Sequence, residues 1–252
     1  SRDTNGGDIW HGGSVASTDG NAVTFTSGVA FAGAVSQGVV GEYLARRTAD
    51  GWNTEATSPE GYPGPPPAVN WMYQRTTPDL DRLVGVAANV RLPGLPRENF
   101  TVYTRDAAGT ITAVGRPRAG LPPAFGTVVG LADDGQTIAF GAGVLDVDSG
   151  PTVPSSFFLG ASRLYYWTDP TNGPRVASLY PDGELATAST GQLSRDGSKI
   201  VWQVDSAPAA HGGGAEVFVR EKGGASVRVS APQGVPAPTA QVFFAGATED
   251  MR

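Results

Sequence analysis

The two histidines are the residues of this sequence best suited to proton transfer or metal binding. His11 and His211 both stand in glycine-rich segments, WHGGS and AHGGG. If the fold brought them together, they could form a metal-binding or acid–base pair. No carboxylate stands beside either one at the spacing of metal ligands, however, so we expect both to be exposed loop residues.

Two acidic stretches could supply the clustered oxygen ligands that a calcium ion requires. The stretch DTNGGD offers Asp3, Asn5 and Asp8, and the stretch LDVDSG offers Asp146 and Asp148. Neither contains the full twelve-residue loop of alternating oxygen ligands that ends on a glutamate. Because ordinary Asx turns explain both stretches better, we assign no metal site, and calcium is the single candidate cofactor.

Other kinds of site are excluded by composition and motif. The sequence contains no cysteine, which excludes disulfides, thiolate nucleophiles and zinc–thiolate sites from this chain. It also lacks the Gly-x-Ser-x-Gly elbow of serine hydrolases, a phosphate-binding loop, a dinucleotide fingerprint and a His-Glu-x-x-His motif. We therefore assign no catalytic residue and expect no enzymatic activity from this chain alone.

The charge balance argues against nucleic acid as a partner. The 24 acidic residues outnumber the 18 basic ones, and Lys and Arg form no cluster. Binding to a phosphate backbone without regard to sequence needs such a cluster. The sequence also contains no run of about 18 apolar residues, so we expect no membrane-spanning helix.

An internal repeat provides the elements that must position any site. An aspartate in a turn, followed by an alternating apolar run, occurs five times at intervals of 54 to 62 residues. The copies are ASTDGNAVTF (16–25), TTPDLDRLVG (76–85), LADDGQTIAF (131–140), LSRDGSKIVW (193–202) and ATEDMR (247–252). The repeated aspartates are Asp19, Asp79, Asp134, Asp196 and Asp250, which we interpret as turn formers rather than catalysts.

Each copy predicts a β-hairpin. Asp-Gly between apolar segments is a strong hairpin signal, and runs such as Val23-Thr24-Phe25 alternate with the period of a half-buried strand. About 25 residues later each repeat has a second apolar run, a glycine-containing turn and another strand, as in EYLARRTADGWNTEAT around Gly51. The corresponding turns contain Gly109, Gly173, and Gly223 or Gly224. Each repeat therefore predicts four antiparallel strands.

A four-stranded antiparallel unit repeated at a fixed period predicts an all-β fold, a β-propeller, because each blade buries its faces against its neighbours. We predict one propeller region over 1–252, with about four blades and the opening strand of a fifth. The approximate blade bounds are 12–58, 71–115, 126–180, 188–231 and, for the fifth, 240–252. This region would be part of a larger ring, or a small closed ring in which 241–246 completes a blade.

The period is long because loops are inserted into the blades. Segments rich in Gly, Pro and Ala are expected between the second and third strands of each blade, at 30–41, 91–98, 144–161 and 206–214. A proline-rich link at 59–70 is expected to be extended and polyproline-like.

Aromatic residues outside the alternating runs could stack on sugars or anchor a protein partner. We prefer the interpretation that they cover blade edges. They are Trp10, Trp52, Tyr62, Trp71 and Tyr73. Two further tryptophans, Trp167 and Trp202, fall within predicted strands and are expected in the core.

The turn SRDGSKIVW followed by EVFVREKGGASVRVS resembles the blade signature of TolB-type propellers. The opening NGGDIWHGGSVASTDGNAVTFTS resembles N-terminal propeller regions of secreted actinobacterial proteins of unknown role. The resemblance implies a propeller fold and an extracellular or cell-envelope location. Two turns depart from the pattern, because Leu80 and Met251 stand where glycine is expected.

Three functions fit these observations. The first is a non-catalytic scaffold, secreted or at the cell surface, that binds a protein or glycan through its long loops. The alternative is a regulatory or substrate-gating propeller of a hydrolase or glycan-active enzyme whose catalytic part lies outside this chain. The third is self-association through unpaired blade edges.

Overall fold

A computed structural model describes residues 9–28, 41–63, 69–97, 100–120, 126–151, 162–168, 171–231, 244–248 and 251, without the side chains of 9–13 and 69–74. The chain divides into two compact units, Ser1–Arg116 and Pro117–Arg252. Each unit contains two sheets. No helix in the described ranges is long and apolar enough to cross a membrane.

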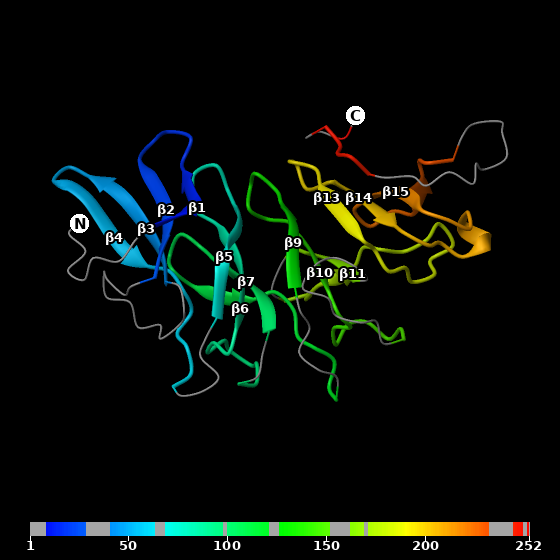
Figure 1. The fold of residues 1–252 in the computed structure, drawn as a ribbon, viewed down its shortest axis with the longest axis horizontal. Helices are drawn as coiled ribbons and strands as arrows, with labels where there is room; N and C mark the ends of the chain where they lie inside the picture. Colours follow the sequence, from blue (N-terminus) through cyan, green and yellow to red (C-terminus); the bar gives the residue numbers. More distant parts are fainter. Residues whose placement is uncertain are drawn as a thin grey trace. The chain divides into compact units, whose positions relative to one another are not determined.

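Unit 1 contains blades 1 and 2 (Figure 1). Blade 1 consists of β1 (Ile9–Ala16), β2 (Ala22–Ser27), β3 (Gly41–Thr48) and β4 (Gly51–Ala56). Blade 2 consists of β5 (Val69–Thr76), β6 (Leu83–Ala88), β7 (Phe100–Arg105) and β8 (Ile111–Ala113). In both blades the strands follow one another across the sheet in chain order, and all neighbours are antiparallel.

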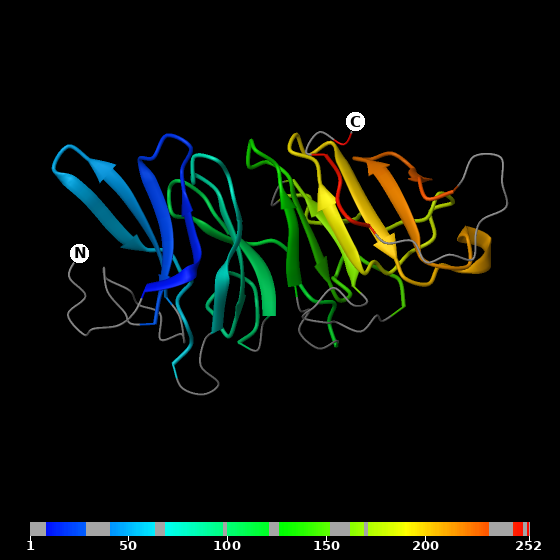
Figure 2. The same cartoon turned by 45° about the horizontal axis from the view of Figure 1, so that its top comes forward.

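Unit 2 contains blades 3 and 4, with the same strand order (Figure 2, green to orange). Blade 3 consists of β9 (Gly126–Leu131), β10 (Ile138–Ala142), β11 (Arg163–Trp167) and β12 (Arg175–Val176). Blade 4 consists of β13 (Thr190–Leu193), β14 (Lys199–Val204), β15 (Glu216–Glu221) and β16 (Ser226–Arg228). The predicted all-β fold of four-stranded antiparallel propeller blades is confirmed.

The strand bounds also locate the predicted loops. The four inserts lie between the second and third strands of their blades, as predicted. Two first strands begin earlier than expected, β1 at Ile9 and β5 at Val69. The predicted polyproline-like link is therefore shorter than 59–70, because Val69 and Asn70 pair with β6. Its central part, 64–68, lies outside the described residues.

The pairing register supports the predicted equivalence of the first hairpins. In each blade the residue six positions after the repeated aspartate pairs with a buried aromatic residue of the third strand. The pairs are Phe25–Tyr43, Gly85–Tyr103, Phe140–Tyr165 and Trp202–Phe218. Three of them are stacked rings with centroids 4.5 to 5.6 Å apart, and the tyrosine of the fourth covers its glycine. Each repeat thus builds the same central aromatic layer.

The turns keep one backbone conformation even where glycine is absent. The residue after the repeated aspartate has a positive φ of 69 to 71° at Gly20, Gly135 and Gly197, 60° at Leu80 and 48° at Met251. Leu80 is buried with Ala22, Leu44 and Leu83 in a cluster that joins blades 1 and 2. Burying a leucine contributes about 1.5–3 kcal/mol, which exceeds the cost of about 1–2 kcal/mol of one left-handed residue.

Hydrogen bonds link the turns of adjacent blades within each unit. The Thr18 amide donates to the Pro78 carbonyl at 2.9 Å in unit 1, and the Asp133 amide donates to the Arg195 carbonyl at 2.8 Å in unit 2. All four residues immediately precede a repeated aspartate. The joint between blades is therefore made by the same backbone atoms in both units.

The described part of the fifth repeat lies against blade 4. The Gln192 side-chain amide both donates to and accepts from the backbone of Ala247, at 3.3 and 3.2 Å. The Met251 amide donates to the Thr248 carbonyl, as in the other turns. Residues 244–248 form no strand, and the rest of the predicted opening strand lies outside the described residues.

A hydroxyl–carboxylate contact closes three of the turns. In blade 4 the Ser194 hydroxyl donates to Asp196 Oδ1 at 2.6 Å, and the Ser198 amide donates to the same oxygen at 3.0 Å. These hydrogen bonds, the Ser194 one first, lower the pKa of Asp196 to about 2. Ser17 with Asp19 and Thr77 with Asp79 repeat the contact at 2.6 Å.

Replacing Ser194 by alanine is expected to raise the pKa of Asp196 from about 2 toward 3.8. A carboxyl whose pKa is lower in the folded than in the unfolded chain stabilises the fold at any pH above its unfolded-state pKa. This stabilisation is lost as the pH falls through its folded-state pKa. S194A should therefore be less stable than the wild type at neutral pH, and this difference in stability should shrink as the pH falls from about 4 to about 2. A carboxyl-carbon NMR titration measures the shift, with the exposed Ser206→Ala as control. An unchanged Asp196 pKa in S194A would contradict the assignment.

Candidate functional site

The insert of blade 4 folds into a short 3₁₀ helix that presents one histidine. The helix η1 spans Ala209–His211, after Pro208 and before Gly212 and Gly213. Pro208 starts the turn with a fixed φ, and the two glycines end it with φ of 123° and 76°. A hydrogen bond from the Ala207 amide to the Gly214 carbonyl at 2.7 Å closes the loop.

The imidazole of His211 is held by ring stacking. It lies parallel to the ring of Tyr180, with centroids 3.8 Å apart and an interplanar angle of 7°. Tyr180 in turn packs against the rings of Trp202 and Phe218 in the core of unit 2. The side chain of His211 is only 7% exposed. Because the ring plane is fixed, the direction of Nε2 is fixed as well.

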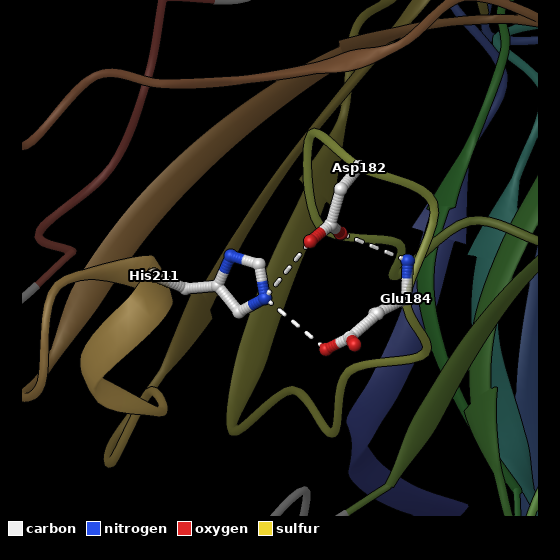
Figure 3. Close-up of side chains that lie close together, drawn as sticks. All are labelled: Asp182, Glu184 and His211. Atoms are coloured by element: carbon white, nitrogen blue, oxygen red, sulfur yellow. Dashed lines mark hydrogen bonds and ion pairs between the residues drawn. The ribbon is translucent and has the colours of Figure 1, made fainter.

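Nε2 of His211 faces two carboxylates from the link between blades 3 and 4 (Figure 3). Asp182 Oδ2 lies 3.4 Å from it and Glu184 Oε2 lies 3.3 Å from it. The segment Tyr-Pro-Asp-Gly-Glu forms a tight turn, in which the Glu184 amide donates to Asp182 Oδ1 at 3.0 Å. Gly183 has a φ of 88° in this turn, so both acidic side chains project on one side.

A cavity of about 260 Å³ lies beside these groups. It is lined by Pro181, Asp182, Ala210, His211, Phe218 and Arg228. Arg228 is oriented by a two-pronged ion pair with the buried carboxylate of Glu216, with Nε–Oε2 at 2.8 Å and Nη2–Oε1 at 2.5 Å. The cavity thus offers the exposed apolar surfaces of Pro181 and Ala210 together with one guanidinium, one carboxylate and one imidazole.

Two carboxylates lie close to both Tyr180 and His211. Burial, together with the nearby charges of Glu184 and Asp182, raises the pKa of the Tyr180 hydroxyl. The same two carboxylates face His211 Nε2, so the cluster attracts a positive charge. Asp182, Glu184 and His211 each offer one ligand atom, and these atoms lie within 4.8 Å of one another.

The contact between insert and link recurs in other blades, and we call it the clasp. In blade 2, Val90 of the insert forms a β-bridge with Gly61 of the preceding link. In blade 3, Leu145 of the insert bridges to Pro117 of the preceding link. In blade 4 the described residues form the clasp through side chains, from His211 to Asp182 and Glu184. In blade 4 the contacts of His211 with Asp182 and Glu184 thus join insert and link where a backbone β-bridge joins them in blades 2 and 3.

The expectation that His211 is an exposed loop residue without nearby carboxylates was wrong. The side chain is buried, and its carboxylate neighbours come from 27 and 29 residues earlier in the chain. A search for ligands close in sequence cannot find such a pair. The Asp-Gly turn at 182–183 was the available signal, because it resembles the repeat turns but lies outside their spacing. The side chain of His11 lies outside the described residues.

The calcium candidates have different surroundings. Asp3, Asn5 and Asp8 lie outside the described residues. Asp146 is exposed, whereas Asp148 is buried. The carboxylate of Asp148 accepts hydrogen bonds from protein donors only: Arg163 Nε at 2.8 Å, the Tyr165 hydroxyl at 3.0 Å and the Gly150 amide at 2.7 Å. The interpretation of both stretches as ordinary Asx turns rather than calcium sites stays a prediction.

The aromatic residues divide as follows. Trp167 and Trp202 are buried, so their predicted core position is confirmed. Trp52 is half exposed on β4, with the guanidinium carbon of Arg47 5.9 Å from its ring centroid. Tyr62 lies beneath the guanidinium groups of Arg91 and Arg97 of the blade 2 insert, at 5.6 and 5.8 Å. The side chains of Trp10, Trp71 and Tyr73 lie outside the described part of the chain.

Comparison with known proteins adds to the fold assignment. The chain matches no protein-family model and no curated protein. Among solved structures it is similar to a putative TolB from Agrobacterium tumefaciens, with a TM-score of 0.41 and 15% identity over 84% of this chain and 62% of that one. It is similar to the β-propeller domain of the Trilobed protease from Pyrococcus furiosus, with a TM-score of 0.44 and 9% identity over 88% and 57% of the two chains.

A third similarity is to a structure from an analysis of two prolyl endopeptidases, with a TM-score of 0.50 and 12% identity over 91% of this chain and 30% of that one. The chain thus spans less than two thirds of each of the three similar structures. The resemblance to actinobacterial propeller regions stays a prediction. With its four four-stranded antiparallel sheets, each with its strands in chain order, the chain is a run of β-propeller blades.

Proposed function

We propose that this chain is a non-catalytic binding scaffold, secreted or held at the cell surface, that recognises a protein or glycan through its inserts. The observation that carries this proposal is the cavity of about 260 Å³ between the insert of blade 4 and the link before that blade. Binding sites commonly combine an apolar wall with a few oriented polar groups. Pro181 and Ala210, which are exposed, supply the apolar wall here, and Asp182, His211 and Arg228 supply the polar groups.

The clasps support this proposal. A loop that is already ordered loses less conformational entropy on binding than a free loop. In blade 2 the clasp adds to its β-bridge a hydrogen bond from the Arg91 amide to the Glu60 carbonyl at 2.7 Å. In blade 3 the Arg118 amide donates to the Val144 carbonyl at 3.1 Å. The described parts of the inserts of blades 2 and 3 are therefore ordered by backbone hydrogen bonds before any partner binds.

Filling the cavity is expected to abolish binding. Ala210 is exposed and lines the cavity, so Ala210→Trp places a large ring there without removing any polar group. The wild-type chain is screened against a glycan array and an extracellular proteome, and affinity for each retained partner is compared in the variant. We expect at least about tenfold weaker binding, equivalent to about 1.4 kcal/mol.

The matched control is Ala107→Trp, which adds the same ring to an exposed turn of blade 2. It should bind as the wild type does. Retention of no glycan and no protein by the wild-type chain would overturn the proposal. Equal loss of binding in both variants would show that the cavity is not the site.

A second candidate is a regulatory or substrate-gating propeller of a hydrolase. It is favoured by the TM-score of 0.50 to the prolyl endopeptidase structure, of which this chain covers 30%. An active-site-directed serine-hydrolase probe applied to the native protein separates the two functions. Labelling of a polypeptide that contains this chain would favour the gate, and no labelling would favour the scaffold.

A further inference from the structure

We infer that Asp182, Glu184 and His211 form a binding site for a divalent metal ion of the zinc class. The first argument is the distance between the groups. Charge-assisted hydrogen bonds from nitrogen to a carboxylate are about 2.7–2.9 Å long. The distances from His211 Nε2 to Asp182 Oδ2 and Glu184 Oε2 are 3.4 and 3.3 Å, which are long for such bonds.

Those distances match the edges of a metal coordination polyhedron. Zinc binds histidine nitrogen at about 2.0–2.1 Å and carboxylate oxygen at about 2.0–2.2 Å. In tetrahedral geometry, two such ligands are about 3.3–3.5 Å apart. Both nitrogen–oxygen distances therefore fit a single ion, and all three ligand atoms lie within 4.8 Å of one another. Binding would need only a rotation of the two exposed carboxylates toward each other. A proton on Nε2 can form a good hydrogen bond to only one of the two carboxylates, whereas one metal ion can coordinate both.

The second argument is preorganisation of the ligands. The ring of His211 is 7% exposed and is stacked on Tyr180, so Nε2 does not have to be ordered when the ion binds. Asp182 is held by the Glu184 amide through its other oxygen, Oδ1. The oxygen that faces the histidine, Oδ2, is thus the one left for the ion (Figure 3).

The third argument is charge. An imidazole nitrogen with two carboxylates suits a borderline cation such as Zn²⁺, whereas Ca²⁺ takes six to eight oxygen ligands. Two carboxylates neutralise a divalent ion. Their exposed fractions, 53% and 70%, leave a path for the ion to enter. Three protein ligands leave the fourth position open, and the adjoining cavity has room for a water molecule or a ligand oxygen there.

The test is calorimetric titration of the full 252-residue chain, stripped with a chelator, with Zn²⁺. We expect one site per chain. Glu184→Gln and Asp182→Asn keep shape and exposed position, so both variants should fold. Loss of an outer-shell partner alone commonly weakens metal binding about 10–100-fold, so loss of either ligand should weaken it at least about tenfold. The control Asp205→Asn changes an exposed carboxylate between β14 and the insert of blade 4 and should bind as the wild type does.

A spectroscopic measurement tests the geometry. Co²⁺ bound in the same site should give the intense visible absorption of four-coordinate cobalt, and this band should be lost in E184Q and D182N. Absence of Zn²⁺ binding would overturn the inference. Zn²⁺ affinity equal in the wild type and in both ligand variants would overturn it too, as would a site that prefers Ca²⁺ to Zn²⁺.

Discussion

Replacing Trp202 by alanine is expected to lower the free energy of unfolding of unit 2 by about 3–5 kcal/mol. The side chain is fully buried and stacks on Phe218 with centroids 4.5 Å apart. Its cluster also contains Leu164 and Ala139 of blade 3. Because a blade shares its core with its neighbour, amide exchange should accelerate in β10 and β11 as well as in β14. Urea unfolding and hydrogen exchange measure the two effects.

The control for this variant is Trp52→Ala. Trp52 is 50% exposed and contacts Arg47 through its ring face. Its loss should lower the free energy of unfolding by less than about 1 kcal/mol. If W202A accelerated amide exchange only within blade 4, the inference that blades 3 and 4 are stabilised by one shared core would be wrong.

Replacing Asp148 by alanine is expected to destabilise unit 2 by about 3–5 kcal/mol, because it leaves a buried guanidinium without its carboxylate. The side chains of Asp148 and Arg163 are 0% and 2% exposed, and Nε lies 2.8 Å from Oδ2. The remaining partners of Arg163 are neutral carbonyls, those of Ala186 at 3.4 Å and Pro151 at 3.3 Å. Urea unfolding measures the loss.

Two further variants separate the charge effect from lost packing. The double variant Asp148→Ala with Arg163→Met removes both charges and should recover part of the stability. Asp133→Ala breaks the ion pair with Arg195, whose side chains are 44% and 55% exposed, and should cost less than about 1 kcal/mol. If the double variant were no more stable than D148A alone, the unpaired charge would not explain the loss.

The fold could be predicted from the sequence because its signals are local and repeated. An Asp-Gly turn followed by an alternating run requires a hairpin, and four copies at a steady interval require four similar units. The positions of the inserts followed from the same count. The early start of β5 at Val69 could not be seen, because a proline-rich segment gives no periodicity to mark where pairing begins.

The candidate site could not be predicted, since its groups meet only in three dimensions. His211 has no carboxylate neighbour along the chain, and its partners stand in a link that the repeat does not include. Asp148 was considered as a calcium ligand and interpreted as a residue of an ordinary Asx turn, and its sequence neighbours give no sign of Arg163, which reaches it from β11. In the sequence, Leu80 departs from the repeat because it stands where glycine is expected. Its buried contacts across blades 1 and 2 explain why it is tolerated there.

The hydrogen bond between the turns of adjacent blades has a direction along the chain, because the earlier turn donates and the later turn accepts. Each turn can receive an amide from the turn before it and offer its own amide to the turn after it. Pro78 accepts the Thr18 amide but, as a proline, has no N–H to donate, whereas Arg195 accepts the Asp133 amide and is a residue type that carries an N–H. A proline immediately before the repeated aspartate can thus accept this bond between turns but cannot donate it, whereas any other residue type at that position can do both.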